Sequence, residues 1–166
     1  MRGNVAEGLG GIWRSDDAGR TWRNLGLKDG RHITRIIIHP RDPNTVWVGV
    51  MGHLFGPNEE RGVYKTTDGG KTWKKMLYAN NQTGCSDLVM EPGNPNVFYA
   101  GMWHVIRTPY SMESGGEGSG IYKSVDGGET WKNISTNKGF PKGVWGIVGV
   151  AVAPSNTDKI FAIVEN

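Results

Sequence analysis

Short apolar runs that stop at a proline recur along the 166-residue chain. They read IIIHP at residues 36–40, LVMEP at 88–92 and VAVAP at 150–154. A polar turn and a second apolar run, VWVGVM, VFYAGM or IFAIV, follow each of them. Runs this short, rich in β-branched and aromatic residues and bounded by turn residues, predict strands rather than helices.

A more polar phrase of eight residues lies between these runs and also occurs three times. It reads SDDAGRTW at 15–22, TTDGGKTW at 66–73 and SVDGGETW at 124–131, and a strand-like run (GIWR, GVYK or GIYK) precedes each copy. The aspartates at its third position are 51 and 58 residues apart. The chain therefore repeats one unit of about fifty residues.

We expect this phrase to form the turn of a β-hairpin. The aspartate can accept hydrogen bonds from nearby main-chain N–H groups, and the following glycine adopts a positive φ at little cost. The hydroxyl residues can bond across the turn, and the tryptophan can cover the apolar space between sheets. The residues with this structural role are Ser15, Asp17, Gly19, Thr21 and Trp22, then Thr66, Asp68, Gly70, Thr72 and Trp73, then Ser124, Asp126, Gly128, Thr130 and Trp131.

Four strands per unit, joined by hairpins, predict four-stranded antiparallel sheets. One such sheet cannot bury two apolar faces alone, whereas copies stacked radially, as in a β-propeller, cover each other. Counted this way, residues 1–166 are an all-β, incomplete propeller: a half blade at 11–25, blades at 33–77 and 85–134, and a half blade at 147–164. Propellers usually have four to eight blades, so we expect completion by remaining blades of a longer chain or by self-association.

Composition and charge narrow the range of partners. Nineteen Lys and Arg residues face sixteen Asp and Glu residues, and no basic run occurs, so the sequence does not indicate nucleic-acid binding. No apolar run approaches transmembrane length, and the single cysteine, Cys85, excludes an internal disulfide. We expect no membrane association, no cofactor and no metal.

The phrase S/T-x-D-x-G-x-T-W resembles the Asp-box, also called the bacterial neuraminidase repeat, and all three copies match it. The stretches GHLFGPNEERGVYKTTDGGKTW at 52–73 and RTPYSMESGGEGSGIYKSVDGGETW at 107–131 are similar to exported bacterial sortilin-like propellers, which are often labelled glycosyl hydrolases. The resemblance covers essentially the whole chain and implies an Asp-box propeller in an extracellular or periplasmic location. It does not select an activity, because sialidases, xyloglucanases, sortilin-type receptors and photosystem assembly factors share these boxes.

In propellers that resemble this chain, loops between the second and third strands build the ligand face. One such loop spans 13 positions from Gly49 to Gly62, and the other spans 19 from Gly101 to Gly120. Aromatic residues and arginine in a lengthened loop suit sugar stacking or peptide capture. The ligand-binding candidates are Trp103, His104, Arg107 and Tyr110 in the longer loop, and His53, Glu59 and Arg61 in the shorter one.

Each candidate also has a structural interpretation. Trp103 can fill space between blades, His53 and His104 can be packing residues, and the stretch 59–61 can be a solvated turn with a local ion pair. The sequence favours a recognition scaffold that binds protein, peptide or glycan.

The alternatives are a fragment of a glycoside hydrolase and an assembly-factor platform. Hydrolysis needs paired carboxylates, but nothing in the sequence pairs any two of the candidate acids, so no catalytic residue is assigned. These acids are Asp29, Glu59, Glu60, Glu113 and Glu117.

Overall fold

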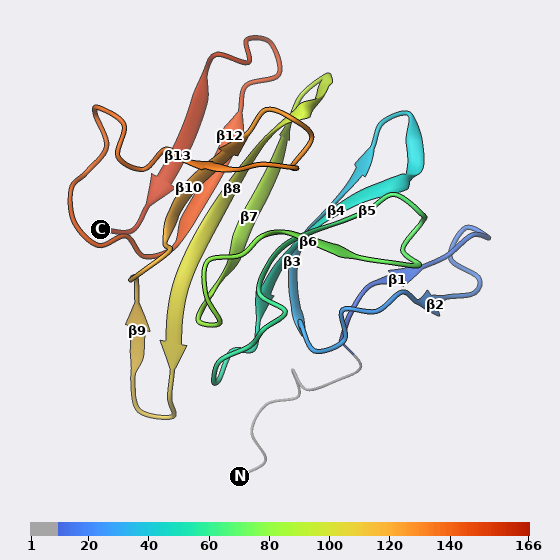
Figure 1. The fold of residues 1–166 in the computed structure, drawn as a ribbon, viewed down its shortest axis with the longest axis horizontal. Helices are drawn as coiled ribbons and strands as arrows, with labels where there is room; N and C mark the ends of the chain where they lie inside the picture. The colour runs from blue at the N-terminus through green and yellow to red at the C-terminus, as the bar shows by residue number, and fades with distance from the viewer. Residues whose placement is uncertain (1–9) are drawn as a thin grey trace.

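The structure is a computed structural model that describes residues 10–166, and within that range it contains thirteen strands and no helix (Figure 1). The strands form four antiparallel sheets that stand side by side in chain order. The predicted all-β class, built from four-stranded antiparallel blades, is confirmed. Across the described residues no helix could span a membrane.

The four sheets differ in strand number. A two-stranded sheet pairs β1 (Trp13–Arg14) with β2 (Arg23–Asn24). The second sheet holds β3 (His32–His39), β4 (Asp42–Gly52), β5 (Gly62–Thr66) and β6 (Lys74–Leu77) in that order. The third holds β7 (Thr83–Glu91), β8 (Asn94–Arg107), β10 (Gly120–Ser124) and β11 (Lys132–Asn133), and β9 (Met112–Ser114) pairs with the far end of β8. The last sheet pairs β12 (Val148–Val152) with β13 (Ile160–Val164).

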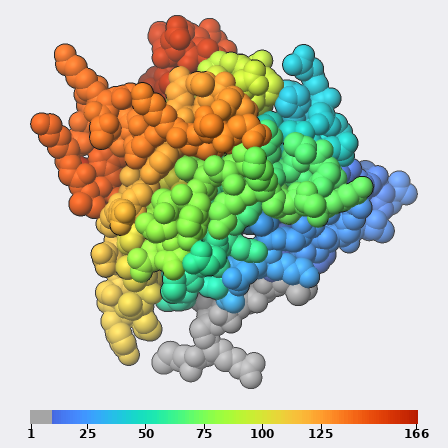
Figure 2. All heavy atoms as spheres, in the orientation of Figure 1, coloured from blue at the N-terminus to red at the C-terminus, as the bar shows by residue number. Residues whose placement is uncertain are grey.

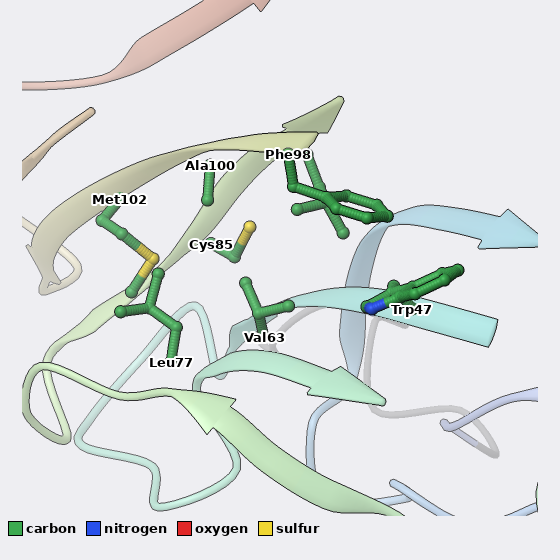
Figure 3. Packing of buried hydrophobic residues seen from close by; sticks show 8 residues of the cluster. Trp47, Val63, Leu77, Cys85, Phe98, Ala100 and Met102 are labelled. Atoms are coloured by element: carbon green, nitrogen blue, oxygen red, sulfur yellow. The ribbon is translucent and has the colours of Figure 1, made fainter. Parts of the chain in front are cut away.

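Apolar side chains fill the spaces between neighbouring sheets. Because successive side chains of a strand point to opposite faces, β4 places Trp47 against the third sheet and Val48 against the first. In the same way β8 places Phe98 toward the second sheet and Tyr99 toward the last. Figure 3 shows the middle space, where Trp47 and side chains of β5 and β6 meet those of β7 and β8.

Polar contacts join the same sheets. Trp47 packs on Phe98 with ring centroids 4.6 Å apart, and its indole N–H donates to the Gly127 carbonyl at 2.9 Å. Near the start of β3, the hydroxyl of Thr34 donates to the carbonyl of Cys85 in the next sheet at 2.9 Å. Ser86 on β7 likewise donates to the carbonyl of Val148 at 2.8 Å. The first strands of successive sheets are therefore fixed to one another.

The three repeated phrases form hairpin turns with one shared set of hydrogen bonds. In each, the carboxylate accepts the main-chain N–H and the hydroxyl of the threonine four residues later. The leading Ser or Thr donates to the aspartate and accepts the N–H of the glycine. The N–H to Oδ1 distances are 2.8 Å for Thr21–Asp17, 3.0 Å for Thr72–Asp68 and 2.9 Å for Thr130–Asp126.

These hydrogen bonds favour the charged form of each aspartate. They lower the pKa of Asp17 and of Asp126 to about 2, and the pKa of Asp68 falls further. In all three, the threonine hydroxyl is the largest cause and the threonine N–H the next. The carboxylates are therefore acceptors within the turn.

The hairpin tryptophans make two kinds of contact. Trp73 donates its indole N–H to the Leu25 carbonyl in the preceding sheet at 2.7 Å, so it joins two sheets. Trp22 and Trp131 instead donate to the glycine carbonyl of their own turns, each at 3.0 Å. Trp22 is exposed. Of the three hairpin tryptophans, only Trp73 thus donates its indole N–H to a neighbouring sheet.

Replacement of Asp126 by alanine tests the structural role of the turn carboxylate. Asp126→Ala leaves the N–H and hydroxyl of Thr130 without their charged acceptor, so we expect the melting temperature to fall by about 3–8 °C. The matched control is Glu129→Ala in the same turn. Glu129 forms exposed ion pairs with Lys65 and Lys74, and its loss should shift the melting temperature by less than about 2 °C. Equal shifts for the two variants would contradict this role.

Acid titration provides a second test of the same carboxylates. Their pKa values are lowered in the folded chain, so the unfolded chain takes up protons first as the pH falls. The resulting stabilisation is complete above about pH 4 and should be lost progressively as the pH falls toward about 2. Thermal melts between pH 7 and pH 2 should show this decline, and Asp126→Ala should show less of it. An identical decline in both proteins would contradict the assignment.

Candidate functional site

Three loops meet at the ends of the sheets opposite the repeat hairpins: 53–61, 78–82 and 108–119. The N–H of Asn58 donates to the carbonyl of Asn81 at 2.8 Å, which joins the first loop to the second. The side-chain amide of Asn80 donates to the carbonyl of Glu117 at 3.1 Å, which joins the second to the third. The loops therefore form one continuous surface across two sheets.

The lengthened connection after β8 is a projecting hairpin. β8 continues to Arg107, and the chain turns at residues 108–111 and returns as β9, with Val105 opposite Ser114. The hairpin extends beyond the body of the molecule (yellow in Figures 1 and 2). Within the turn, the N–H of Thr108 donates to the Ser111 carbonyl at 2.9 Å. The added residues thus form an ordered arm, where the sequence indicated only a loop.

The tip of this arm is the most solvent-exposed part of the candidate set. Tyr110 is 98% exposed, and Met112 is also exposed. Arg107 lies opposite Met112 in the hairpin, with a guanidinium nitrogen 3.7 Å from the Met112 sulfur. An aromatic ring, a thioether and a planar cation are thus presented together.

Trp103 lies at the base of the arm. Its indole N–H donates to the Ser114 hydroxyl at 2.9 Å, and Ser114 donates to Glu165 Oε2 at 2.5 Å. Glu165 also accepts the N–H of Ile147 at 3.0 Å, and these two bonds lower its pKa. Trp103 is therefore part of an anchor between the arm and the last sheet, and the structure does not place it beside Tyr110.

The two candidate histidines make separate contacts. His104 is buried, its ring lies against Gly116, and its Nδ1 shares a hydrogen bond of 3.3 Å with the Thr83 hydroxyl. His53 pairs with Asp29, with Nε2 and Oδ1 2.9 Å apart. Among residues 10–166 no cluster of three or more His, Cys, Asp or Glu side chains is suited to hold a metal ion.

Arg61 and Glu59 organise the shorter loop. Arg61 is fully buried and donates to the carbonyl of His53 at 2.8 Å, and burial lowers its pKa. Its guanidinium therefore holds the loop together and is not presented to solvent. Glu59 accepts the phenol O–H of Tyr78 at 2.7 Å and lies at the surface.

A cavity of about 780 Å³ opens beside the base of the arm. It lies between loop 116–119 and segment 133–145. The rings of Phe140 and Trp145 line it and meet edge to face, with centroids 5.0 Å apart. The sequence analysis did not identify this segment as part of the candidate site. Its pair of aromatic residues between two blades is the signal that could have indicated it.

The known proteins that resemble this chain are much longer than it is. "Vacuolar protein sorting/targeting protein 10" of Sordaria macrospora is 42% identical over 66 residues, which cover 39% of this chain and 4% of that protein. "Probable oligoxyloglucan-reducing end-specific xyloglucanase" of Neosartorya fischeri is 24% identical over an alignment of 180 residues, which covers 92% of this chain and 21% of that protein. The chain therefore spans about a fifth or less of these relatives' lengths.

The fold has counterparts among solved structures. The crystal structure of an ancestral GH74 enzyme matches 93% of this chain and 19% of its own, with a TM-score of 0.65 and 18% sequence identity. At that identity the match shows the fold alone. The sequence model of the Sortilin-Vps10 family, described as "Sortilin, neurotensin receptor 3", matches residues 10–165. The chain belongs to the Sortilin-Vps10 family.

Proposed function

We propose that the chain is a recognition scaffold of a larger, exported, sortilin-like Asp-box propeller that binds protein, peptide or glycan. The observation that carries the proposal is the arm, which presents an almost fully exposed tyrosine, Tyr110, on an ordered hairpin. An exposed ring on a stiff support binds at a small cost in conformational entropy.

The chemistry of the arm suits an extended partner. Arg107 can grip a carboxylate or stack on a ring, and Met112 adapts to apolar surfaces of varied shape. The cavity beside the arm adds the aromatic residues Phe140 and Trp145 to the same region. A peptide or glycan can therefore contact the arm and extend into the cavity.

We propose that this binding takes place outside the cytoplasm. Membership in the Sortilin-Vps10 family and similarity to xyloglucanases support an extracellular or periplasmic setting. No metal or cofactor is needed for the contacts described, because aromatic, guanidinium and thioether groups supply them.

Binding measurements on arm variants test this proposal. In the longer chain that carries these blades, Tyr110→Ala and Arg107→Ala should each weaken binding about tenfold, the level expected for interface anchors. The probes are xyloglucan oligosaccharides and peptides selected from a random display library, with calorimetry as the readout. Val125→Ala is the control, since Val125 is exposed on the repeat hairpin at the opposite end of the same sheet. Unchanged binding in both arm variants would remove the arm from the site.

The alternative function is glycoside hydrolysis, as part of a larger enzyme. The similarity to a protein named as a xyloglucanase favours it. Asp29, Glu59, Glu113 and Glu117 are exposed carboxylates on the loop end. Two of them are engaged within the chain, Asp29 by His53 and Glu59 by Tyr78.

Turnover separates the two functions. Release of reducing ends from xyloglucan is measured for the longer chain and for Asp29→Asn, Glu59→Gln and Glu113→Gln. The scaffold proposal predicts that no variant changes the rate. Loss of turnover in one of them, with oligosaccharide binding retained, would favour the hydrolase.

A further inference from the structure

The cavity beside the base of the arm combines an aromatic ring with a polar lining. All of its lining comes from residues 116–145, where the third sheet joins the last. Its volume of about 780 Å³ lies in the range of sites that hold small molecules or parts of larger ligands. The groups that this lining offers therefore indicate what the cavity can bind.

Phe140 is the ring that a ligand can reach, and its surroundings hold it in place. Its ring meets that of Trp145 edge to face. Trp145 is buried and donates its indole N–H to the Pro141 carbonyl at 3.1 Å. The main-chain N–H of Phe140 donates to the carbonyl of Asn137 at 3.3 Å. Phe140 itself is half-buried and lines the cavity, so the accessible part of its ring forms a fixed apolar surface there.

Hydrogen-bond donors form much of the polar lining. The Ser119 hydroxyl oxygen accepts the N–H of His104 at 2.9 Å, and that of Ser135 accepts the N–H of Ile121 at 2.9 Å. Asn133 uses its side-chain oxygen in the same way, for the N–H of Ser135 at 2.9 Å. None of these three side chains donates a hydrogen bond within residues 10–166. Their O–H and N–H groups therefore remain available to a ligand.

Two lysines add positive charge to the same lining. Lys138 and Lys142 are exposed at the cavity, and neither forms an ion pair with another residue of the described part of the chain. The lining also contains the carboxylate of Glu117, which is exposed. Two ammonium groups and one carboxylate leave an excess of positive charge. An anionic ligand rich in acceptors complements this lining best.

We propose that the cavity binds an oligosaccharide that carries carboxylate groups, of the uronic-acid class. The C–H face of one sugar ring packs on Phe140, as sugars do on aromatic surfaces. The ammonium groups of Lys138 and Lys142 pair with the carboxylates of the sugar. The hydroxyls of Ser119 and Ser135 donate to its ring substituents. This inference rests on the recognition function proposed above and names the ligand of one part of that surface.

The groups in the cavity distinguish this ligand from two others. A neutral glycan would leave both ammonium groups without a countercharge. An extended acidic peptide brings main-chain N–H donors that need acceptors, whereas Ser119, Ser135 and Asn133 already use their oxygens to accept a main-chain N–H. A carboxylate-bearing sugar supplies a flat C–H face, acceptors and negative charge together.

Calorimetry with three probes tests the class of ligand. Trigalacturonic acid, its fully methyl-esterified form and a hexaglutamate peptide are each titrated into the longer chain that carries these blades. Trigalacturonic acid should bind, and added salt should weaken the binding because exposed charges are screened. The methyl ester keeps the sugar rings but loses the charges, so it should bind about tenfold more weakly.

Charge variants test the contacts in the cavity. Lys138→Gln combined with Lys142→Gln should weaken trigalacturonic acid binding about tenfold, and the fold should be unaffected because both side chains are exposed. Glu117→Gln removes the like charge and should strengthen the binding about threefold. Lys71→Gln is the matched control, since Lys71 is an exposed lysine of a repeat hairpin at the opposite end of the sheets. It should leave the binding unchanged.

The outcomes separate this inference from the recognition function. Equal binding of the acid and its ester, or unchanged binding in the double lysine variant, would overturn the acidic glycan as the ligand. If Tyr110→Ala still weakened binding of a peptide or of a xyloglucan oligosaccharide, the recognition function would stand. Tighter binding of hexaglutamate than of trigalacturonic acid would assign the cavity to acidic peptides and would also overturn the inference. Binding of none of these probes would overturn the recognition function as well.

Discussion

The structure depends on the requirement that each sheet be covered on both faces. β4 points Trp47 to one side and Val48 to the other, and both are buried only because a sheet stands on each side. Each large apolar side chain buried in this way contributes roughly 1.5–3 kcal/mol. Stability is therefore a property of neighbouring pairs of sheets, and the two-stranded sheets at the ends are the least covered.

The two ends of each blade have different structural roles. At one end, the repeat hairpins are fixed by the hydrogen bonds of Asp17, Asp68 and Asp126. At the other end, connections carry no repeated phrase, so they can differ in length without disturbing the space between sheets. The arm after β8 is the largest such difference, and its anchor through Trp103 and Ser114 keeps it ordered.

The repeats allowed the fold to be predicted, but the side-chain environment of the candidate site was not predictable. Strands and turns are determined by local sequence patterns of about five to eight residues. Each of these patterns occurs three times in the chain. β9 has only three residues, Met112–Ser114, and the connection around it contains Pro109, Gly115 and Gly116, so its pairing with β8 leaves no periodic signal. The burial of Arg61 depends on the carbonyls of an irregular loop, and no pattern in the sequence encodes their positions. The ligand-binding candidates remain predictions.

Amide hydrogen exchange, measured strand by strand, tests directly whether mutual covering of sheets holds the fold together. The account predicts the slowest exchange in β4 and β8, which have a sheet on each side, and much faster exchange in β1 and β2. Trp47→Ala should accelerate exchange in β4 and β8 together, because the ring joins the second and third sheets. Acceleration confined to β4, with β8 unchanged, would contradict the account.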